Sequence, residues 1–576
     1  MKNQPTIERG TPRAAPVRLA GLAALAAGIA VGLQAAQPPT ENGHAKQPVG
    51  PRHSIASKGF SAAPLSPYAA EILRRQGKSL KEPKFINHGK KFNPQGDVVG
   101  PLTVDPVQKI LVIFVQFTTP PPGGPATRLD LHYFDDLLFG TVYDPPEYAP
   151  YPGHPTDRTL KDYYKEVSYG KVDIITLNLP STLWWAQCGK PYDYYCRADG
   201  IHDNGFGPYP ENGQGLVIDA IKAVDSLVDF SQYAVNGEVP NLFVVHAGAA
   251  AEFGGGDPAL IWSHEWDLSD GTGLDGYWAD GVKINNYAMM YEVGGDLTGF
   301  MGLGILGPYP PTVGVFAHEY GHVLGLPDQY DYGYESDGTG DYSLMAKGSS
   351  AMWYPNPTFP DFFMFYGNSP VHMDAWSKCR LGFVTPVKVE PNQPVSAVLL
   401  PVEAAPVVYR MDVPNSGGKE YFLLENRQHI GFDQGLACVT RPYQGFFPIG
   451  RGLAIWHIDD TVLTRNYWLP NEAENWKEFR SEGWRKADTG ETHYGISVIQ
   501  ADDRWDLERI PFWSGDTGDL YPGALGVTRF GNDTHPNSSS YYFWPGSEPK
   551  YGLSGVTVDN IAEVNGVITA YLSFAR

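Results

Sequence analysis

Two kinds of hydrophobic pattern alternate along residues 105–385. The continuous apolar runs KILVIFVQFTT (109–119) and NLFVVHAG (241–248) are typical of strands buried on both faces. TLKDYYKEVSYG (159–170) and GQGLVIDAIKAVDSLVDF (213–230) instead carry apolar residues at helical spacing. A further strand is expected in KVDIITLNLP. Strands that alternate with helices predict a mixed α/β (α+β) domain.

The pattern changes beyond about residue 386. Short strand-like runs separated by Gly, Pro and Asp follow one another, among them YFLLEN (421–426), GLAIWHID (452–459) and GVITAYLSF (566–574). Runs of this length and spacing predict a separate all-β domain of β-sandwich type over residues 386–576.

The N-terminal region predicts export. Arg9, Arg13 and Arg18 precede an uncharged stretch rich in Ala and Gly, LAGLAALAAGIAVGLQAA. This predicts a signal peptide over residues 1–36 that is cleaved near its end, with a permanent membrane anchor as the weaker alternative. The protein is therefore expected to be secreted, without stable membrane insertion once the signal is removed.

Residues 37–104 are rich in Pro, Lys and Gly and have little strand pattern. Their place between the signal and the first strand predicts a pro-segment that covers the active site and is removed after export. A flexible extension is the alternative.

The charge balance excludes some partners. The formal net charge is -21, with 42% hydrophobic residues, so a globular protein is expected and nucleic acid or an anionic membrane is not. A soluble monomer that acts on protein or peptide substrates fits better. Four cysteines suit an exported protein: Cys188 and Cys196 could close a short loop and leave Cys379 with Cys438. Other pairings and four buried free thiols remain open.

The stretch VFAHEYGHVLGLPDQY (315–330) carries the chemistry. With Thr312 as N-cap, a helix would place His318 and His322 on one face, one turn apart, so both rings can reach one zinc ion. Glu319 lies beside His318 in the general-base position of an HExxH arrangement. The alternative is a core helix that carries polar residues.

A third zinc ligand is expected from the residues after the helix. Gly325 can adopt the left-handed conformation that ends a helix, and Pro327 prevents the helix from continuing. Asp328 can then turn back toward the metal, with Asp331 and Glu335 as the next candidates. The lone histidines His264 and His372 are expected to be structural or cleft residues.

HEYGHVLGLPDQYD resembles the HExxHxxGxxD signature of the immune inhibitor A family of secreted zinc metallopeptidases, relatives of the metzincins. Other segments in the same order are similar, including IWSHEW, YSLMAKGS, SPVHMDAWSKCRLGF and GRGLAIWHIDD, and the resemblance extends over roughly residues 108–576. It implies a metzincin-like fold, His318, His322 and Asp328 as zinc ligands, and Glu319 as general base. It also implies Met345 as the methionine of the turn beneath the metal.

The expected function is zinc-dependent endopeptidase activity. A catalytically silent surface-binding protein and a zinc hydrolase of non-peptide substrates are the rivals. The family's calcium-type loop is replaced by FSQYAVNGEVPN, which makes calcium at that place doubtful. The acidic stretches DQYDYGYESDGTGD and SGDTGDLYPG are further candidates for Ca²⁺, although solvated loops are the commoner explanation.

Overall fold

The structure is a computed structural model of the whole chain. It describes residues 60–64, 101–122, 124, 128–140, 158–294, 310–333, 336–353, 366–441, 445–472, 493–509, 515–542 and 552–575. Residues Ile55–Arg576 form one compact unit. The predicted signal peptide and most of the predicted pro-segment lie outside the described residues. Among the described helices, none is long and apolar enough to cross a membrane.

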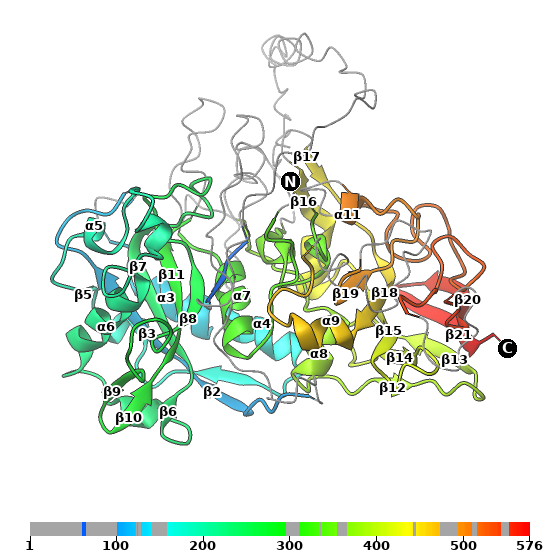
Figure 1. Cartoon of the computed structure of the whole chain (residues 1–576), viewed down its shortest axis with the longest axis horizontal. Helices are drawn as coiled ribbons and strands as arrows, with labels where there is room; N and C mark the ends of the chain where they lie inside the picture. Colours follow the sequence, from blue (N-terminus) through cyan, green and yellow to red (C-terminus); the bar gives the residue numbers. More distant parts are fainter. Residues whose placement is uncertain are drawn as a thin grey trace, which may run out of the picture. The chain divides into compact units, whose positions relative to one another are not determined.

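The main sheet has six strands in the order β1-β8-β11-β7-β3-β5 (Figure 1). Their bounds are β1 Phe60–Ala62, β3 Leu111–Gln116, β5 Ala186–Gln187, β7 Leu242–Ala249, β8 His264–Asp267 and β11 Asn286–Val293. The strands β3, β5, β7 and β11 are parallel, whereas β8 is antiparallel to β11 and β1 is antiparallel to β8. The two apolar runs predicted as buried strands form β3 and β7, and β7 is buried at every position.

Helices and small sheets surround the main sheet. The helices are α3 His132–Phe139, α4 Leu160–Val167, α5 Tyr192–Tyr195, α6 Gly213–Val224, α7 Val313–Val323 and α8 Ala375–Arg380. Helix α6 contacts β3, and α7 contacts β11, β8 and β1. The small sheets pair β2 Val107–Lys109 with β4 Asp173–Ile175, and combine β6 Glu238–Val239, β9 Tyr277–Ala279 and β10 Val282–Ile284. The mixed α+β class is thus confirmed.

The part beyond residue 386 contains two larger sheets. One has the order β12-β14-β15-β18-β19 and the other β13-β21-β20. Their bounds are β12 Val387–Lys388, β13 Val395–Leu399, β14 Tyr409–Asp412, β15 Glu420–Arg427, β18 Gly452–Asp459, β19 Ile496–Val498, β20 Val556–Val564 and β21 Val567–Phe574. A hairpin of β16 Val439–Arg441 and β17 Gly445–Phe447 and the helices α9 Asp460–Arg465 and α11 Asp506–Arg509 lie between them in sequence. Because of these helices, an all-β description is not confirmed.

Strand β15 is buried on both faces. Since successive side chains of a strand point to opposite faces, Phe422 and Leu424 lie in a core with residues of the second sheet, such as Leu572. Tyr421 and Leu423 lie in the core that also contains α7 and the main sheet. One hydrophobic core therefore crosses residue 386, and the predicted domain boundary there stays a prediction.

One sequence expectation is confirmed only in part and another is wrong. KVDIITLNLP forms the expected strand, but β4 covers only three of its residues, and a 3-10 turn begins at Pro180. Cys188 and Cys196 are buried free thiols and do not form a disulfide. Their Sγ atoms approach different carbonyls, those of Lys190 and Pro258. Cys379 is also free, and the side chain of Cys438 lies outside the described residues.

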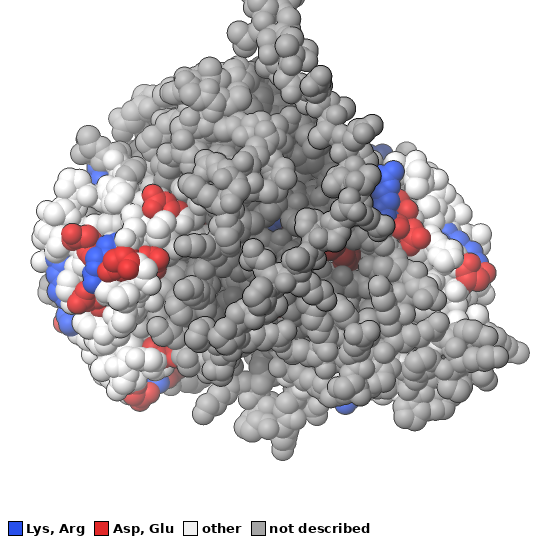
Figure 2. Space-filling view, turned by 45° about the horizontal axis from the view of Figure 1, so that its top comes forward, with Lys and Arg blue, Asp and Glu red and all other residues white. Residues whose placement is uncertain are grey.

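The charges on the described surface are mixed in sign. Figure 2 shows Lys and Arg next to Asp and Glu on both flanks of the face in view. Arg197 lies 2.8 Å from Asp199, and Lys283 lies 2.9 Å from Asp275. Exposed pairs of this kind contribute about 0–1 kcal/mol each, so they do little to hold the fold.

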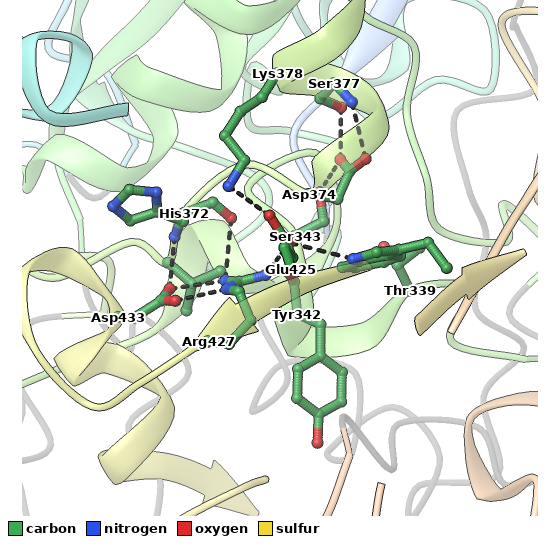
Figure 3. Close-up of polar contacts among 12 residues, drawn as sticks. Thr339, Tyr342, Ser343, His372, Asp374, Ser377, Lys378, Glu425, Arg427 and Asp433 are labelled. Carbon is green, nitrogen blue, oxygen red and sulfur yellow. Dashed lines mark hydrogen bonds and ion pairs between the residues drawn. The ribbon is translucent and has the colours of Figure 1, made fainter. Parts of the chain in front are cut away.

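Buried ion pairs connect β15 to α8 and to the turn before Met345 (Figure 3). The Arg427 Nε atom lies 2.5 Å from Asp433, and Arg427 Nη1 donates to the Tyr342 carbonyl at 2.7 Å. Glu425, two residues earlier, lies 2.6 Å from the ammonium of Lys378. Burial alone would raise the pKa of the Asp433 carboxyl, but Arg427 holds that pKa below its usual range. Asp433 is therefore ionised and paired with Arg427.

Replacing one member of this buried pair is expected to destabilise the fold strongly. Arg427→Met leaves the Asp433 carboxylate buried without its cation, and should lower the free energy of unfolding by about 3–5 kcal/mol. The double variant Arg427→Met, Asp433→Leu should lose less than the sum of the two single variants. Guanidinium unfolding followed by tryptophan fluorescence measures all three. Arg529→Met, which breaks an exposed pair with Asp533, is the control and should change stability by less than about 1 kcal/mol. Additive losses at Arg427 and Asp433 would contradict the coupling.

Candidate metal centre

The predicted HEYGH helix forms as α7 and carries both histidines. It begins at Thr312, as predicted, although the Thr312 hydroxyl donates to the Tyr366 carbonyl and does not cap the helix. His318 and His322 lie four residues apart and are fully buried. Their Nε2 atoms are 3.1 Å apart, so both rings lie on one face of the helix.

Asp328 reaches the same point because the chain turns sharply after α7. Gly325 has a φ of 100°, in the left-handed region that glycine adopts at helix ends. The Asp328 Oδ1 atom lies 3.1 Å from His318 Nε2 and 3.2 Å from His322 Nε2. The three ligand atoms all lie within 4.8 Å of one another. The structure thus brings together the three residues predicted from the sequence.

Backbone carbonyls orient the two imidazoles. His318 Nδ1 lies 2.9 Å from the Leu344 carbonyl, and His322 Nδ1 lies 2.8 Å from the Leu326 carbonyl. Because a carbonyl only accepts, each Nδ1 must donate its proton, which leaves an Nε2 lone pair directed at Asp328 in a neutral ring. Tyr332 donates its hydroxyl to Asp328 Oδ2 and fixes that carboxylate.

The electrostatics of this group favour a cation. Burial alone would raise the pKa of the Asp328 carboxyl, but the two imidazoles hold that pKa below its usual range, so Asp328 is ionised. Burial lowers the pKa of His318, whereas at His322 burial is outweighed, mainly by the charge and hydrogen bond of Asp328, and the pKa is raised. Asp328 Oδ1 receives no hydrogen bond from the described residues. Two nitrogen lone pairs and a carboxylate oxygen therefore converge in a buried place, and this donor set fits zinc, which prefers imidazole and carboxylate ligands.

Glu319 lies beside the group on the same helix. Its side chain is fully buried, and neither carboxyl oxygen has a hydrogen-bond partner among the described residues. Burial raises the pKa of this carboxyl, and the nearby Asp328 and Glu252 raise it further. A buried carboxyl without a donor destabilises a fold, and such groups concentrate at sites that act on a reactant.

Met345 lies beneath α7, where the family resemblance places it. A Cβ atom at Gly321 would be only 2.5 Å from Met345 Sδ, so a glycine between the two histidines is what allows the close approach. The Met345 carbonyl accepts from Gln329 N at 2.8 Å. The turn and the loop that carries Asp328 therefore support each other.

Several supporting residues were missed in the sequence. Asp374, at the N-cap of α8, accepts from Gln329 Nε2 at 2.8 Å and from Ser343 Oγ at 3.0 Å (Figure 3). Asn471 donates to the Gln329 carbonyl at 2.9 Å. The Asp-x-x-Ser pattern in DAWS would have predicted the helix cap, but local sequence holds no signal for the contacts with residues far along the chain.

The two lone histidines have structural contacts. His264 lies 2.7 Å from the Trp262 carbonyl and packs on Phe206, and His372 lies 2.9 Å from Glu166. Neither belongs to the three-residue group, as expected.

One acidic stretch also forms a cluster. Asp502, Asp516 and Asp519 approach within 4.8 Å. Asp519 accepts from the Tyr342 hydroxyl at 2.9 Å, so it already holds the fold together. The described residues give no support for calcium.

Comparison with known proteins places these residues in a family. Residues 108–362 match the family described as "Immune inhibitor A peptidase M6, catalytic domain". Immune inhibitor A of Bacillus thuringiensis subsp. alesti is 36% identical over 221 residues, which are 34% of this chain and 29% of that protein. Pre-pro-metalloprotease PrtV of Vibrio cholerae serotype O1 (strain M66-2) is 36% identical over 122 residues, 20% of this chain and 12% of that protein. The chain thus covers less than a third of the length of either relative.

The matched residues include α7, Asp328 and Met345. A family of peptidases and a relative named a metalloprotease support a metal-dependent peptidase function for this segment. The resemblance of the segments after residue 362 stays a prediction. The resemblance to the immune inhibitor A family is thereby confirmed for residues 108–362, which are similar to the catalytic domain of that peptidase family.

Proposed function

We propose that the protein is a secreted zinc endopeptidase that hydrolyses peptide bonds of protein or peptide substrates. The observation that supports this most is the buried convergence of His318, His322 and Asp328 beside the Glu319 carboxyl. In this proposal the first three residues bind zinc and Glu319 is the general base. Met345 supports the site from below α7.

The chemistry follows from these roles. A zinc ion held by the three residues would polarise the scissile carbonyl and make a water molecule more acidic. Glu319 takes a proton from the attacking water and delivers it to the leaving amine nitrogen, so the same proton is used twice. Both Glu319 oxygens lack a described partner, and they are therefore available for this transfer. Tyr332 keeps Asp328 oriented throughout.

Strand β8 offers a place for an extended substrate. At present β1 pairs with it, with Phe60 opposite Trp266 and Ala62 opposite His264. Helix α7, which carries the histidines, contacts both β1 and β8. A peptide that replaces β1 would gain main-chain hydrogen bonds to β8 and would pass alongside the site.

The same pairing supports a latency role for residues 37–104. Strand β1 belongs to this predicted pro-segment and occupies the place proposed for the substrate, so the segment would block the site until it is removed. The name of one relative, pre-pro-metalloprotease, includes a pre-segment and a pro-segment. We propose a signal peptide over residues 1–36, a β-sandwich-like domain over residues 386–576 and a monomeric secreted enzyme.

A catalytically silent surface-binding protein is the main rival, and a zinc hydrolase of non-peptide substrates is the second. The intact Glu319 and the peptidase family of residues 108–362 disfavour both. Casein digestion with and without a chelator distinguishes the endopeptidase from a catalytically silent protein. Substrate profiling distinguishes it from a zinc hydrolase of non-peptide substrates.

Glu319→Ala is expected to abolish peptidase activity while zinc stays bound, because only the proton carrier is removed. The rate should fall by about 10²–10⁴-fold. Casein hydrolysis measures activity, and elemental analysis measures zinc in the same sample. Glu238→Ala, which removes an exposed carboxylate on β6, is the matched control and should keep both. Wild-type rates in zinc-loaded Glu319→Ala would overturn the assignment.

Asp328→Ala is expected to lower zinc affinity by at least about tenfold, since two histidines alone hold the ion poorly. A competition titration with a chromophoric chelator gives the dissociation constant. Asp331→Ala is the comparison, because its carboxylate accepts from Gly333 N and the Ser336 hydroxyl. Loss of zinc from Asp331→Ala but not from Asp328→Ala would show that the third ligand is misassigned.

A separately made peptide of residues 37–104 is expected to inhibit the mature enzyme that begins near residue 105. The Ala63→Pro version should inhibit less, since it lacks the N–H that donates to the Ser263 carbonyl at 2.9 Å. Inhibition constants come from hydrolysis of a quenched fluorescent peptide. If neither peptide inhibits and the secreted product keeps the segment, residues 37–104 are a linker.

A further inference from the structure

Glu252 is a buried carboxyl that the proposed reaction does not use. It lies between β7 and β8 and is 1% exposed. Its Oε2 atom accepts a long hydrogen bond of 3.3 Å from Ser263 N, and its Oε1 atom has no partner among the described residues. Burial raises the pKa of this carboxyl to about 7, which the Ser263 side chain opposes. A carboxyl held this way favours a cationic partner.

Glu252 lies next to the place where β1 pairs with the sheet. The Ser263 carbonyl accepts from Ala63 N at 2.9 Å, and Trp262 Nε1 donates to the Ala63 carbonyl at 2.6 Å. The register that sets Ala62 opposite His264 sets Ala63 opposite Ser263. The backbone of residue 63 is therefore held by two hydrogen bonds directly beside the residue that contacts Glu252.

Ser263 projects to the side of the main sheet that α7 contacts. His264 packs against Gly213 of α6, where an added Cβ would lie 3.1 Å from the ring. Since neighbouring residues of a strand alternate, Ser263 faces the other way. Phe253, next to Glu252, packs on Tyr291 with ring centroids 5.2 Å apart, and Tyr291 in turn lies 6.4 Å from Phe316 of α7. Ser263 thus belongs to the side of the sheet that carries the metal helix, and Glu252 contacts its backbone N–H.

Residues directly opposite each other in an antiparallel pair project to the same face, with Cβ atoms about 4.5–5.5 Å apart. A side chain at the position of Ala63 therefore points to the face of Ser263 and Glu252. Ala63 itself, which is 1% exposed, offers only a methyl group there. A lysine or arginine at this position would carry its charge toward the carboxyl.

We propose that Glu252 selects a basic side chain, lysine or arginine, in the peptide that replaces residues 60–64 along β8. This rests on the proposed peptidase function and names its substrate preference. The net charge of -21 favours the approach of cationic peptides in general, and Glu252 determines which residue of the peptide is recognised. The pro-segment uses the same backbone contacts with alanine at this position, so it brings no positive charge toward Glu252.

The test uses the mature, zinc-loaded enzyme and quenched fluorescent peptides that differ at one position. Each position in turn carries lysine, arginine, norleucine or glutamate, and kcat/KM is measured for each. At one position the wild type should prefer lysine or arginine over norleucine by about tenfold, the usual size of one charge-assisted contact. In Glu252→Gln the ratio should fall toward one. Glu252→Asp keeps the charge and should retain part of the preference.

Glu238→Gln, which neutralises an exposed carboxylate on β6 in a different sheet from β8, should leave the ratio as in the wild type. Thermal unfolding and zinc content are recorded for every variant, and Glu252→Asp carries the comparison where Glu252→Gln does not fold. A wild-type ratio below about two at every position overturns the subsite, as does a preference that survives in Glu252→Gln. If the zinc-loaded wild type cleaves no peptide at all, the proposed peptidase function fails first and the subsite fails with it.

Discussion

The rest of the site depends on one constraint, the convergence of two imidazoles and a carboxylate in a fully buried place. His318, His322 and Asp328 bring their ligand atoms within 3.1–3.2 Å of each other, which is unfavourable for lone pairs unless a cation lies among them. The arrangement persists because each residue is held from behind. The carbonyls of Leu344 and Leu326 fix the rings, and the hydroxyl of Tyr332 fixes the carboxylate. The fold therefore holds all three side chains in place through contacts other than those with a metal.

The chain beyond residue 386 is part of this support. The Tyr342 carbonyl, just before the turn that holds His318, accepts from Arg427, and the Gly325 carbonyl accepts from the Tyr467 hydroxyl at 2.6 Å. Arg427 is itself fixed by a buried carboxylate, Asp433. These contacts connect the C-terminal sheets to the chain on both sides of Asp328, at Gly325 and at Tyr342. The catalytic segment and the C-terminal sheets are thus joined at the residues that matter for metal binding.

The sequence predicts those features that depend on neighbouring residues. The four-residue spacing of His318 and His322 and the glycine at 325 determine local geometry, so the helix, the turn and Asp328 could be placed without a structure. Long apolar runs likewise predicted β3 and β7. Contacts between distant segments could not be predicted this way: Arg427 is separated from Tyr342 by 85 residues, and nothing near either one indicates the other. The disulfide prediction for Cys188 and Cys196 failed for a different reason, since a short separation in sequence does not fix the direction of the side chains.

Strand β1 links the fold to its proposed regulation. A ladder of main-chain hydrogen bonds gives affinity to any extended peptide, whereas side chains at alternate positions give selectivity. Just before β8, the Ser263 carbonyl provides such a main-chain contact to Ala63, and the Trp262 indole adds a side-chain hydrogen bond to the Ala63 carbonyl. Selectivity for the side chain comes from the neighbouring carboxyl of Glu252. The methyl group of Ala63 can neither form an ion pair nor donate a hydrogen bond to this carboxyl. A pro-segment with alanine at this position binds β8 through main-chain hydrogen bonds alone. A substrate with a basic residue there has an additional interaction with Glu252, which helps it to compete with the pro-segment. The same position beside β8 would therefore hold the pro-segment before maturation and select basic substrates after the pro-segment is removed.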